Sequence, residues 1–169
     1  GHTDYVYSVD WHPTDPSKLI TCSYDKTTIV WDWNAQKLLC TAKGHTDGVR
    51  CVQWDPTNPT RFATASDDKT LKIWVLSSTP TTTPTCTATL AGHGDWVISL
   101  DWSPTHSNQL LSASADRTAK LWDVETQTCL LTFNGHTSSV WSVTWHRTIS
   151  TLFATGSDDK SIKLWDAKT

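Results

Sequence analysis

The strongest constraint on the fold of this chain is one residue pattern that occurs four times along its 169 residues. In each copy a Gly-His pair is followed by a hydroxyl residue 19 positions after the histidine, an aspartate after 23 and a tryptophan after 29. The four sets are His2, Thr21, Asp25 and Trp31; His45, Thr64, Asp68 and Trp74; His93, Ser112, Asp116 and Trp122; and His136, Thr155, Asp159 and Trp165. Such regular spacing indicates a repeat architecture, in which each unit buries its apolar faces on its neighbours.

Each copy has the pattern of short strands separated by turns. The first strand ends in a tryptophan, and its apolar residues alternate except for one gap of three positions, which predicts a β-bulge. The second strand carries the hydroxyl residue, a tight turn carries the aspartate, and the third strand alternates apolar residues with lysine. The predicted first strands are Val6–Trp11, Val49–Trp54, Val97–Trp102 and Val140–Trp145; the second strands are about 18–23, 61–66, 109–114 and 152–157; and the fourth strands are about 37–41, 86–91 and 128–133.

Composition argues against several classes of function. The formal net charge is −3 and no basic run occurs, so direct binding of nucleic acid is not expected. No apolar stretch approaches the ~20 residues that cross a membrane, and the first residues lack the features of a signal peptide. The five cysteines form no CxxC pair and fall within predicted strands. They are therefore expected to be free thiols, in an intracellular location that is cytoplasmic or nuclear.

One segment interrupts the regular spacing. Residues 77–85, with the sequence SSTPTTTPT, account for the longer interval between the second and third copies. This composition predicts an exposed loop, and an extended linker is favoured over a phosphorylation target. The chain also lacks methionine, which suggests a piece of a longer chain or a processed one.

The residues above resemble those of the WD-repeat β-propellers. A Gly-His pair, an aspartate in a tight turn and a closing Trp-Asp recur at a period near 43 residues, with Trp74-Val75 as the one departure from the closing dipeptide. The resemblance covers residues 1–169, in repeats of about 1–43, 44–91, 92–134 and 135–169. It implies an all-β fold of four blades, each a four-stranded antiparallel sheet, with the last blade lacking its outer strand. It also implies that each repeated set of four residues, called a tetrad below, is a buried hydrogen-bond network.

Rings of this family more often have seven or eight blades than four. An arc of four blades would leave two apolar faces in water, which a soluble protein must cover. The favoured expectation is that the chain continues in the natural protein. The second is that two copies close one ring, and the third is that the four blades close by themselves.

Two sets of residues resemble chemical sites. A histidine, a hydroxyl and an aspartate brought together resemble a nucleophilic triad, but four identically spaced active sites are improbable, so no catalytic residue is expected. His12, His106 and His146 lie in or beside turns without cysteine or carboxylate ligand spacing, and are interpreted as solvated turn residues. The sequence therefore predicts no metal site, no cofactor and no enzymatic activity.

The resemblance implies a binding surface on the narrower face, which the Gly-His loops and the aspartate turns form. The positions three and five residues after each tetrad histidine, and one before each tetrad aspartate, are the expected partner contacts. The candidates are Tyr5, Tyr7, Tyr24, Arg50, Asp67, Trp96, Trp141 and Asp158. Aromatic residues and arginine are common in binding hot spots, although these side chains could instead pack against neighbouring loops.

The sequence therefore predicts a non-catalytic scaffold that presents this face to proteins or peptides. One alternative is a substrate-recognition subunit of a ubiquitin ligase, whose WD-repeat receptors often carry Trp-Asp-x-Arg. Asn34, Glu125 and Lys168 occupy that last position here, which weakens this alternative. Another alternative is a purely structural propeller that assembles through blade edges, and a hydrolase is the rival from a different class.

Overall fold

The computed structural model describes residues 1–76 and 83–168, and this part of the chain forms fifteen β-strands and no helix. Most of the loop predicted at 77–85 lies outside the described residues. The strands are β1 (Val6–Trp11), β2 (Lys18–Ser23), β3 (Thr27–Asp32), β4 (Lys37–Lys43), β5 (Val49–Trp54), β6 (Arg61–Ser66), β7 (Thr70–Val75), β8 (Thr85–Ala91), β9 (Val97–Trp102), β10 (Gln109–Ser114), β11 (Thr118–Asp123), β12 (Thr128–Asn134), β13 (Val140–Trp145), β14 (Leu152–Ser157) and β15 (Ile162–Asp166).

The strands form four antiparallel sheets in which each strand pairs with the next one along the chain. The orders are β1-β2-β3-β4, β5-β6-β7-β8, β9-β10-β11-β12 and β13-β14-β15, so the fourth sheet has three strands as predicted. The first and second strands have the predicted bounds, and the pairing of each first strand with its second shifts register near the first strand's start, where a bulge was expected. The outer strands β4, β8 and β12 are each longer than predicted by one or two residues.

The turn before each third strand has a left-handed residue directly after the tetrad aspartate. Lys26, Lys69, Arg117 and Lys160 have φ angles of 70°, 71°, 73° and 67°. Non-glycine residues adopt this region infrequently because the Cβ is crowded there. The aspartate compensates by accepting hydrogen bonds from the next residue but one, as Asp68 does from the backbone N–H and the hydroxyl of Thr70.

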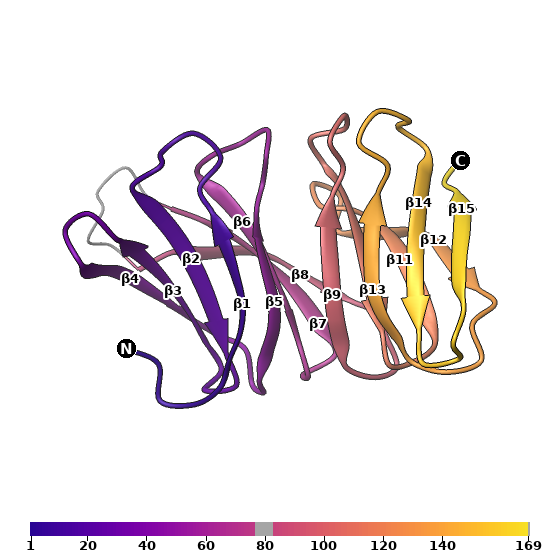
Figure 1. Cartoon of the computed structure of the whole chain (residues 1–169), viewed down its shortest axis with the longest axis horizontal. Helices are drawn as coiled ribbons and strands as arrows, with labels where there is room; N and C mark the ends of the chain where they lie inside the picture. The colour runs from indigo at the N-terminus through magenta and orange to yellow at the C-terminus, as the bar shows by residue number, and fades with distance from the viewer. Residues whose placement is uncertain (77–82, 169) are drawn as a thin grey trace.

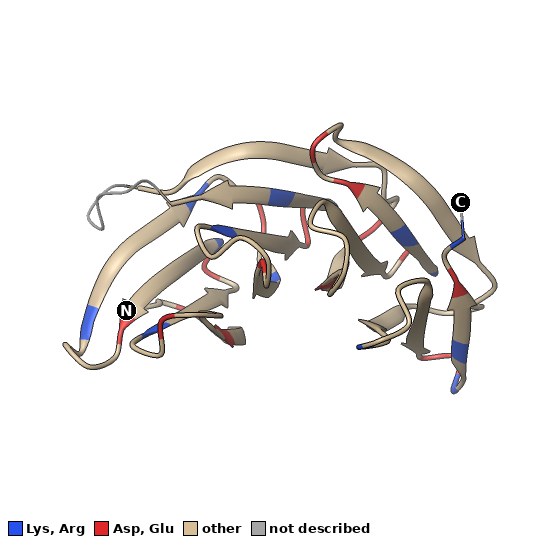
Figure 2. Ribbon diagram, turned by 90° about the horizontal axis from the view of Figure 1, so that it is seen from above, with Lys and Arg blue, Asp and Glu red and all other residues tan. Residues whose placement is uncertain are grey.

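The four sheets stand side by side along an open arc (Figure 1, Figure 2). The first strands β1, β5, β9 and β13 contact one another in sequence, and the outer strands β4, β8 and β12 follow the convex side of the arc. The arc does not close (Figure 2), and β1 and β15 consequently leave apolar side chains uncovered at its two ends. The expectation that four sheets close into a ring by themselves is therefore wrong for this chain.

The hydrophobic core consists of the layers between neighbouring sheets rather than one central cluster. Between the first and second sheets, Ile20, Cys22 and Val30 pack against Val52 and Trp54. Equivalent layers join the second sheet to the third and the third to the fourth. Each sheet therefore depends on its neighbours for most of its burial, as expected for a repeat array.

All five cysteines are free in the structure: Cys22 and Cys40 are buried, Cys51 is half-buried, and Cys86 and Cys129 are exposed. Burial raises the pKa of the Cys22 thiol well above its ordinary value. None of the described residues belongs to a helix that is long and apolar enough to cross a membrane.

Candidate functional site

The four tetrads each form one continuous hydrogen-bonded chain from tryptophan to aspartate. In the second sheet the indole Nε1 of Trp74 donates to Thr64 Oγ1 at 2.9 Å, Thr64 Oγ1 lies 2.7 Å from His45 Nε2, and His45 Nδ1 lies 2.7 Å from Asp68 Oδ2. The other three sheets repeat this arrangement with every link between 2.6 and 2.8 Å. Each chain ties the Gly-His loop to the second strand, the third strand and the turn between them.

The chemistry of the four groups fixes the direction of every hydrogen bond. An indole N–H can only donate, so the hydroxyl oxygen accepts from it. An ionised carboxylate can only accept, so the imidazole Nδ1 must carry a hydrogen, and the hydroxyl directs its own hydrogen to Nε2. Nε2 is then an acceptor, and the neutral imidazole carries its hydrogen on Nδ1, from which it donates to the carboxylate. Every donor is used once, and the histidines of the last three sheets are 7–8 % exposed. A buried chain without a spare hydrogen suits a structural role.

Hydrogen bonds set the charge state of the tetrad carboxylates. Burial alone would raise the pKa of Asp25, but hydrogen bonds from the Thr27 hydroxyl, the Thr3 N–H and His2 lower it to about 2. Burial likewise opposes ionisation of Asp68, and hydrogen bonds from His45 and Thr70 hold its pKa well below the usual range. These carboxylates are therefore ionised acceptors at neutral pH.

The tetrad hydroxyls are poorly placed to act as nucleophiles. Thr64 and Ser112 are 0 % exposed, and Thr155 is 2 % exposed. Each of these oxygens also accepts a hydrogen bond from a tryptophan, which draws electron density from it and makes it a weaker nucleophile. Four identical active sites are improbable, and this geometry is a second reason to interpret the tetrads as structural.

Two of the three turn histidines accept hydrogen bonds from the backbone of their own turns. His12 Nδ1 accepts from the N–H groups of Thr14 and Asp15, and His146 Nδ1 accepts from Thr148 and Ile149. His12 is also less solvated than predicted, because its ring packs 4.7 Å from the ring of Trp54. No group of three or more histidine, cysteine, aspartate or glutamate side chains within residues 1–76 and 83–168 has the arrangement of a metal site.

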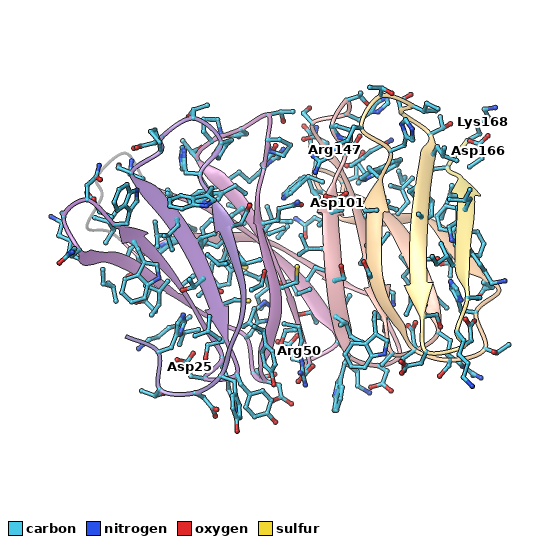
Figure 3. The ribbon with its side chains drawn as sticks, viewed as in Figure 1. Asp25, Arg50, Asp101, Arg147, Asp166 and Lys168 are labelled. Atoms are coloured by element: carbon cyan, nitrogen blue, oxygen red, sulfur yellow. The ribbon has the colours of Figure 1, made fainter. Side chains whose placement is uncertain are left out.

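The Gly-His face is defined here by the loops 1–5, 44–48, 92–96 and 135–139 and the turns 24–26, 67–69, 115–117 and 158–160. In every sheet the residue before the tetrad aspartate donates its N–H to the carbonyl three residues after the tetrad histidine, as Asp67 does to Gly48 at 2.9 Å. The predicted contact positions of one sheet are therefore held side by side. Figure 3 labels Asp25 and Arg50 on this face, and Asp101 and Arg147 toward the opposite one.

Arg50 is the centre of a preformed cluster on the Gly-His face. Its Nε and Nη2 donate to the two carboxylate oxygens of Asp67 at 2.8 and 2.7 Å. Its guanidinium carbon lies 4.5 Å from the ring centre of Tyr7, 5.2 Å from that of Trp96 and 5.7 Å from that of Tyr24. The paired carboxylate raises the pKa of Arg50 above its ordinary value. The cluster therefore joins the first three sheets through one cation.

Gly48 leaves room for this cluster. A Cβ at this position would stand 2.4 Å from Cδ2 of the Tyr24 ring, which is closer than any real contact. Tyr24 in turn meets Tyr7 edge-on, with ring centres 6.2 Å apart. The small residue at this position is therefore part of what lets the aromatic rings approach Arg50.

Five of the eight predicted contact residues come together in this cluster: Tyr7, Tyr24, Arg50, Asp67 and Trp96. The remaining three, Tyr5, Trp141 and Asp158, lie on the first and fourth sheets, outside the cluster. Tyr5 is 74 % exposed and Trp141 is 49 % exposed. The sequence did not reveal that Asp67 neutralises Arg50, because the pairing joins positions 17 residues apart that no other repeat fills with opposite charges.

Sequence reasoning also missed a row of polar side chains at the opposite end of the inner strands. Asp10, Gln53 and Asp101 stand directly before the tryptophans that end β1, β5 and β9, and they line a pocket of about 280 Å³. Each accepts a hydrogen bond from the backbone of the following sheet. Their common position before each tryptophan was visible, but their different side chains gave no repeated motif.

Antiparallel four-stranded sheets that stand side by side around an arc, with their first strands innermost, are the blades of a β-propeller. The family model described as "WD domain, G-beta repeat" matches the chain four times, at residues 1–32, 36–75, 84–123 and 127–166. The chain belongs to the WD-repeat family. Each match contains the first three strands of one sheet, and the last three matches also contain the outer strand of the preceding sheet. The sheets are called blades from here on.

One curated relative shares a short stretch with this chain. Nuclear distribution protein PAC1 of Komagataella phaffii is 56% identical over 32 residues, which is 19% of this chain and 6% of that protein. The likeness is shorter than one repeat and therefore supports the repeat type. It says nothing of the rest of that protein.

Proposed function

We propose that this chain is a non-catalytic scaffold that binds proteins or peptides through the Gly-His face. The observation that carries the proposal is the gathering of large aromatic side chains on this one face, several of them already held in place by Arg50. Rigid aromatic groups supply much contact area at little cost in side-chain entropy. WD-repeat proteins generally serve in protein interaction, which agrees with this use of the face.

The cluster and the isolated aromatics have different parts in the proposal. Tyr7 and Trp96 are 43 and 45 % exposed although each also packs on the guanidinium, so they offer a prearranged platform. Arg50 itself is mostly covered and is matched by Asp67, so it positions the rings rather than offering a free charge. Trp141 makes no comparable contact, so it can lose solvent on binding without disturbing the cluster.

Two further observations support a non-catalytic, intracellular protein. The histidine, hydroxyl and aspartate of each tetrad are hydrogen-bonded to one another inside a blade. The five cysteines remain unpaired, which suits a reducing compartment.

Affinity capture with the chain, followed by mass spectrometry of the retained proteins, tests the proposal. Trp141→Ala and Trp96→Ala should each weaken capture of shared partners by about 2 kcal/mol, or roughly thirtyfold. Trp33→Ala is the matched control, because Trp33 is 52 % exposed but lies after β3, away from the Gly-His face. Unchanged capture by both face variants would place the partner surface elsewhere.

Arg50→Ala gives a different signature. It leaves the nearly buried carboxylate of Asp67 unpaired, so it should lower the melting temperature as well as capture. Trp141→Ala should lower capture alone. Losses of stability for both would indicate packing rather than recognition.

A further inference from the structure

The Gly-His face carries more negative charge than the chain as a whole. Its nine carboxylates are the four tetrad aspartates, Asp67 and Asp158 directly before two of them, and Asp4, Asp47 and Asp95 in the Gly-His loops. Its five cations are Arg50 and the four residues that directly follow the tetrad aspartates. The face therefore has a net charge of −4, whereas the whole chain has a net charge of −3.

Two of these cations are bound to backbone rather than to a carboxylate. Lys26 Nζ donates to the carbonyl of Thr46 in the second blade, and Lys69 Nζ donates to the carbonyl of Gly94 in the third, both at 2.9 Å. These contacts join neighbouring blades along the face. They leave the carboxylates of the Gly-His loops without a cation of their own.

The loop carboxylates hold the same position in three successive blades, two residues after the tetrad histidine. Asp4, Asp47 and Asp95 each accept the N–H of the next residue through Oδ1 at 2.8 Å. Within residues 1–76 and 83–168, no cation pairs with any of the three, and their Oδ2 atoms have no hydrogen-bond donor. Each loop therefore presents an unpaired acceptor on the Gly-His face.

Asp95 stands beside an exposed tryptophan in the interior of the arc. Trp96 is 45 % exposed although β9, which follows it, contacts β5 of one neighbouring blade and β13 of the other. Its exposure is therefore a property of the face and does not depend on either end of the arc. The hydrogen bond from the Trp96 N–H holds the Asp95 carboxylate next to the residue that carries the ring.

Arg50 shows which group this kind of surface holds. Its guanidinium lies over the rings of Tyr7 and Trp96, and both carboxylate oxygens of Asp67 accept from it. A guanidinium suits such a place because it is planar, stacks on aromatic rings and pairs with a carboxylate through two N–H groups. Asp67 also neutralises Arg50, so the cluster does not repel a second cation.

We propose that the partner segment bound by the Gly-His face is basic, and that one of its arginines stacks on the exposed part of Trp96 and pairs with Asp95. The inference rests on the function proposed above and adds the chemistry of the partner. Such an arginine repeats, between two molecules, the arrangement that Arg50 makes within this one. The net charge of the face favours this segment over an acidic peptide or a nucleic acid.

Labelled synthetic peptides test the charge of the segment and the kind of cation. The probes alternate glycine with arginine, with lysine or with glutamate, and fluorescence anisotropy measures their binding to the whole chain. The arginine peptide should bind most tightly. The lysine peptide should bind about fivefold more weakly, because an ammonium does not stack as a planar group. The glutamate peptide and a labelled single-stranded RNA should not bind measurably.

Asp95→Asn and Trp96→Ala separate the two parts of the site. Asparagine keeps an oxygen that accepts from the Trp96 N–H and removes only the charge, so this variant should fold like the wild type. Each change should weaken binding of the arginine peptide about fivefold, as expected for one exposed ion pair or one cation–π contact. Circular dichroism melts report the folding of both variants.

Asp123→Asn and Trp33→Ala are the matched controls for charge and for aromatic surface. Asp123 ends β11 and Trp33 follows β3, so both lie at the ends of third strands that are far from the Gly-His face. Both controls should bind the arginine peptide as the wild type does. A loss of binding in Asp123→Asn equal to that in Asp95→Asn would show attraction to the overall charge rather than to this site, and would overturn the proposal.

Competition connects the probes with natural partners. The arginine peptide should displace proteins captured on the chain, and the glutamate peptide should not. Equal binding of the arginine and glutamate peptides, or wild-type affinity in Asp95→Asn, would overturn the proposal. Binding of the RNA in place of the peptides would overturn it in favour of a different class of partner.

Failure of this inference differs from failure of the proposed function. If Trp96→Ala and Trp141→Ala reduce capture but the arginine peptide neither binds nor competes, the face binds partners of another chemistry. If neither variant reduces capture, the Gly-His face is not the binding surface, and both proposals are wrong.

Discussion

At the scale of single residues, the tetrads show why sequence spacing was so informative. A tryptophan that can only donate and a carboxylate that can only accept define the two ends of a chain of hydrogen bonds. The hydroxyl and the imidazole between them do both. Few other residue sets can fill the same four places, so the pattern persists in every repeat while the surrounding residues vary.

Two aspartates of the third blade should respond very differently to removal. Asp116 accepts from His93 Nδ1, from the Gly94 N–H and from both donors of Thr118. Asp116→Ala leaves these donors without a partner and should reduce the free energy of unfolding by about 3 kcal/mol. Asp123 accepts only from the backbone of the following exposed turn, so Asp123→Ala should cost less than about 1 kcal/mol.

Urea unfolding of both variants and the wild type measures this difference. Equal losses would show that the tetrad contributes no more than an ordinary turn. Replacement of Asp116 by asparagine is a useful companion, because it keeps one acceptor oxygen and should lie between the two.

At the scale of strands and sheets, only some of the features that form the joints between blades are visible in the sequence. The apolar positions of the inner strands and the bulges were predictable, because alternation and its interruption are visible within one strand. The polar links were not, since Asp10, Gln53 and Asp101 differ in type and act on a neighbouring sheet. Their role follows from the curvature of the arc, which no local pattern encodes.

The Arg50 cluster illustrates the same limit. Its members were selected one by one as exposed positions, and five of them do lie together. The pairing with Asp67 and the space left by Gly48 required the three-dimensional arrangement. The outer strands were predicted too short because the residues missed at their ends, Ala42, Lys43, Thr85 and Asn134, are polar or small and carry no apolar alternation signal.

A joint between two blades should lose the most stability when the side chain removed accepts the most hydrogen bonds across it. Asp101 accepts from the Trp145 N–H and the Thr144 hydroxyl of the fourth blade, and from Gln53 of the second. Asp101→Ala should therefore destabilise by about 2 kcal/mol. Asp10 links only one neighbouring blade, and burial raises its pKa, so part of its hydrogen-bond gain is offset by the cost of desolvation.

Asp10→Ala should accordingly cost less than Asp101→Ala. Hydrogen exchange adds a local readout, because protection of the Trp145 amide should fall in Asp101→Ala and remain in Asp10→Ala. An unchanged Trp145 amide in the first variant would contradict the assigned link.

At the scale of the whole molecule, the tetrad carboxylates make stability depend on pH. Their pKa values in the folded chain lie below the ordinary value of about 3.9, with Asp25 at about 2 and Asp68, Asp116 and Asp159 also lowered. The stability they contribute is therefore fully present above about pH 4 and is lost as pH falls through the folded values.

The free energy of unfolding should thus change little through these groups between pH 7 and pH 5, decline below about pH 4 and continue to decline toward pH 2. Urea titrations at several pH values measure the profile. Asp116→Asn, with one titrating tetrad removed, should start lower and decline less steeply. A profile that is flat from pH 5 to pH 2 would contradict the lowered pKa values.

The layered core has a consequence for how the molecule comes apart. The two middle blades have a neighbour on each side, and the two end blades have one, so opening an end blade breaks a single interface. The tetrad of the first blade is also less covered, since Thr21 and Trp31 are only half-buried while Thr64 and Trp74 are buried. In a linear array of this kind, unfolding is therefore expected to begin at an end blade and to proceed toward the middle. Any contact that joins the two ends would abolish the starting points and make unfolding a single concerted event.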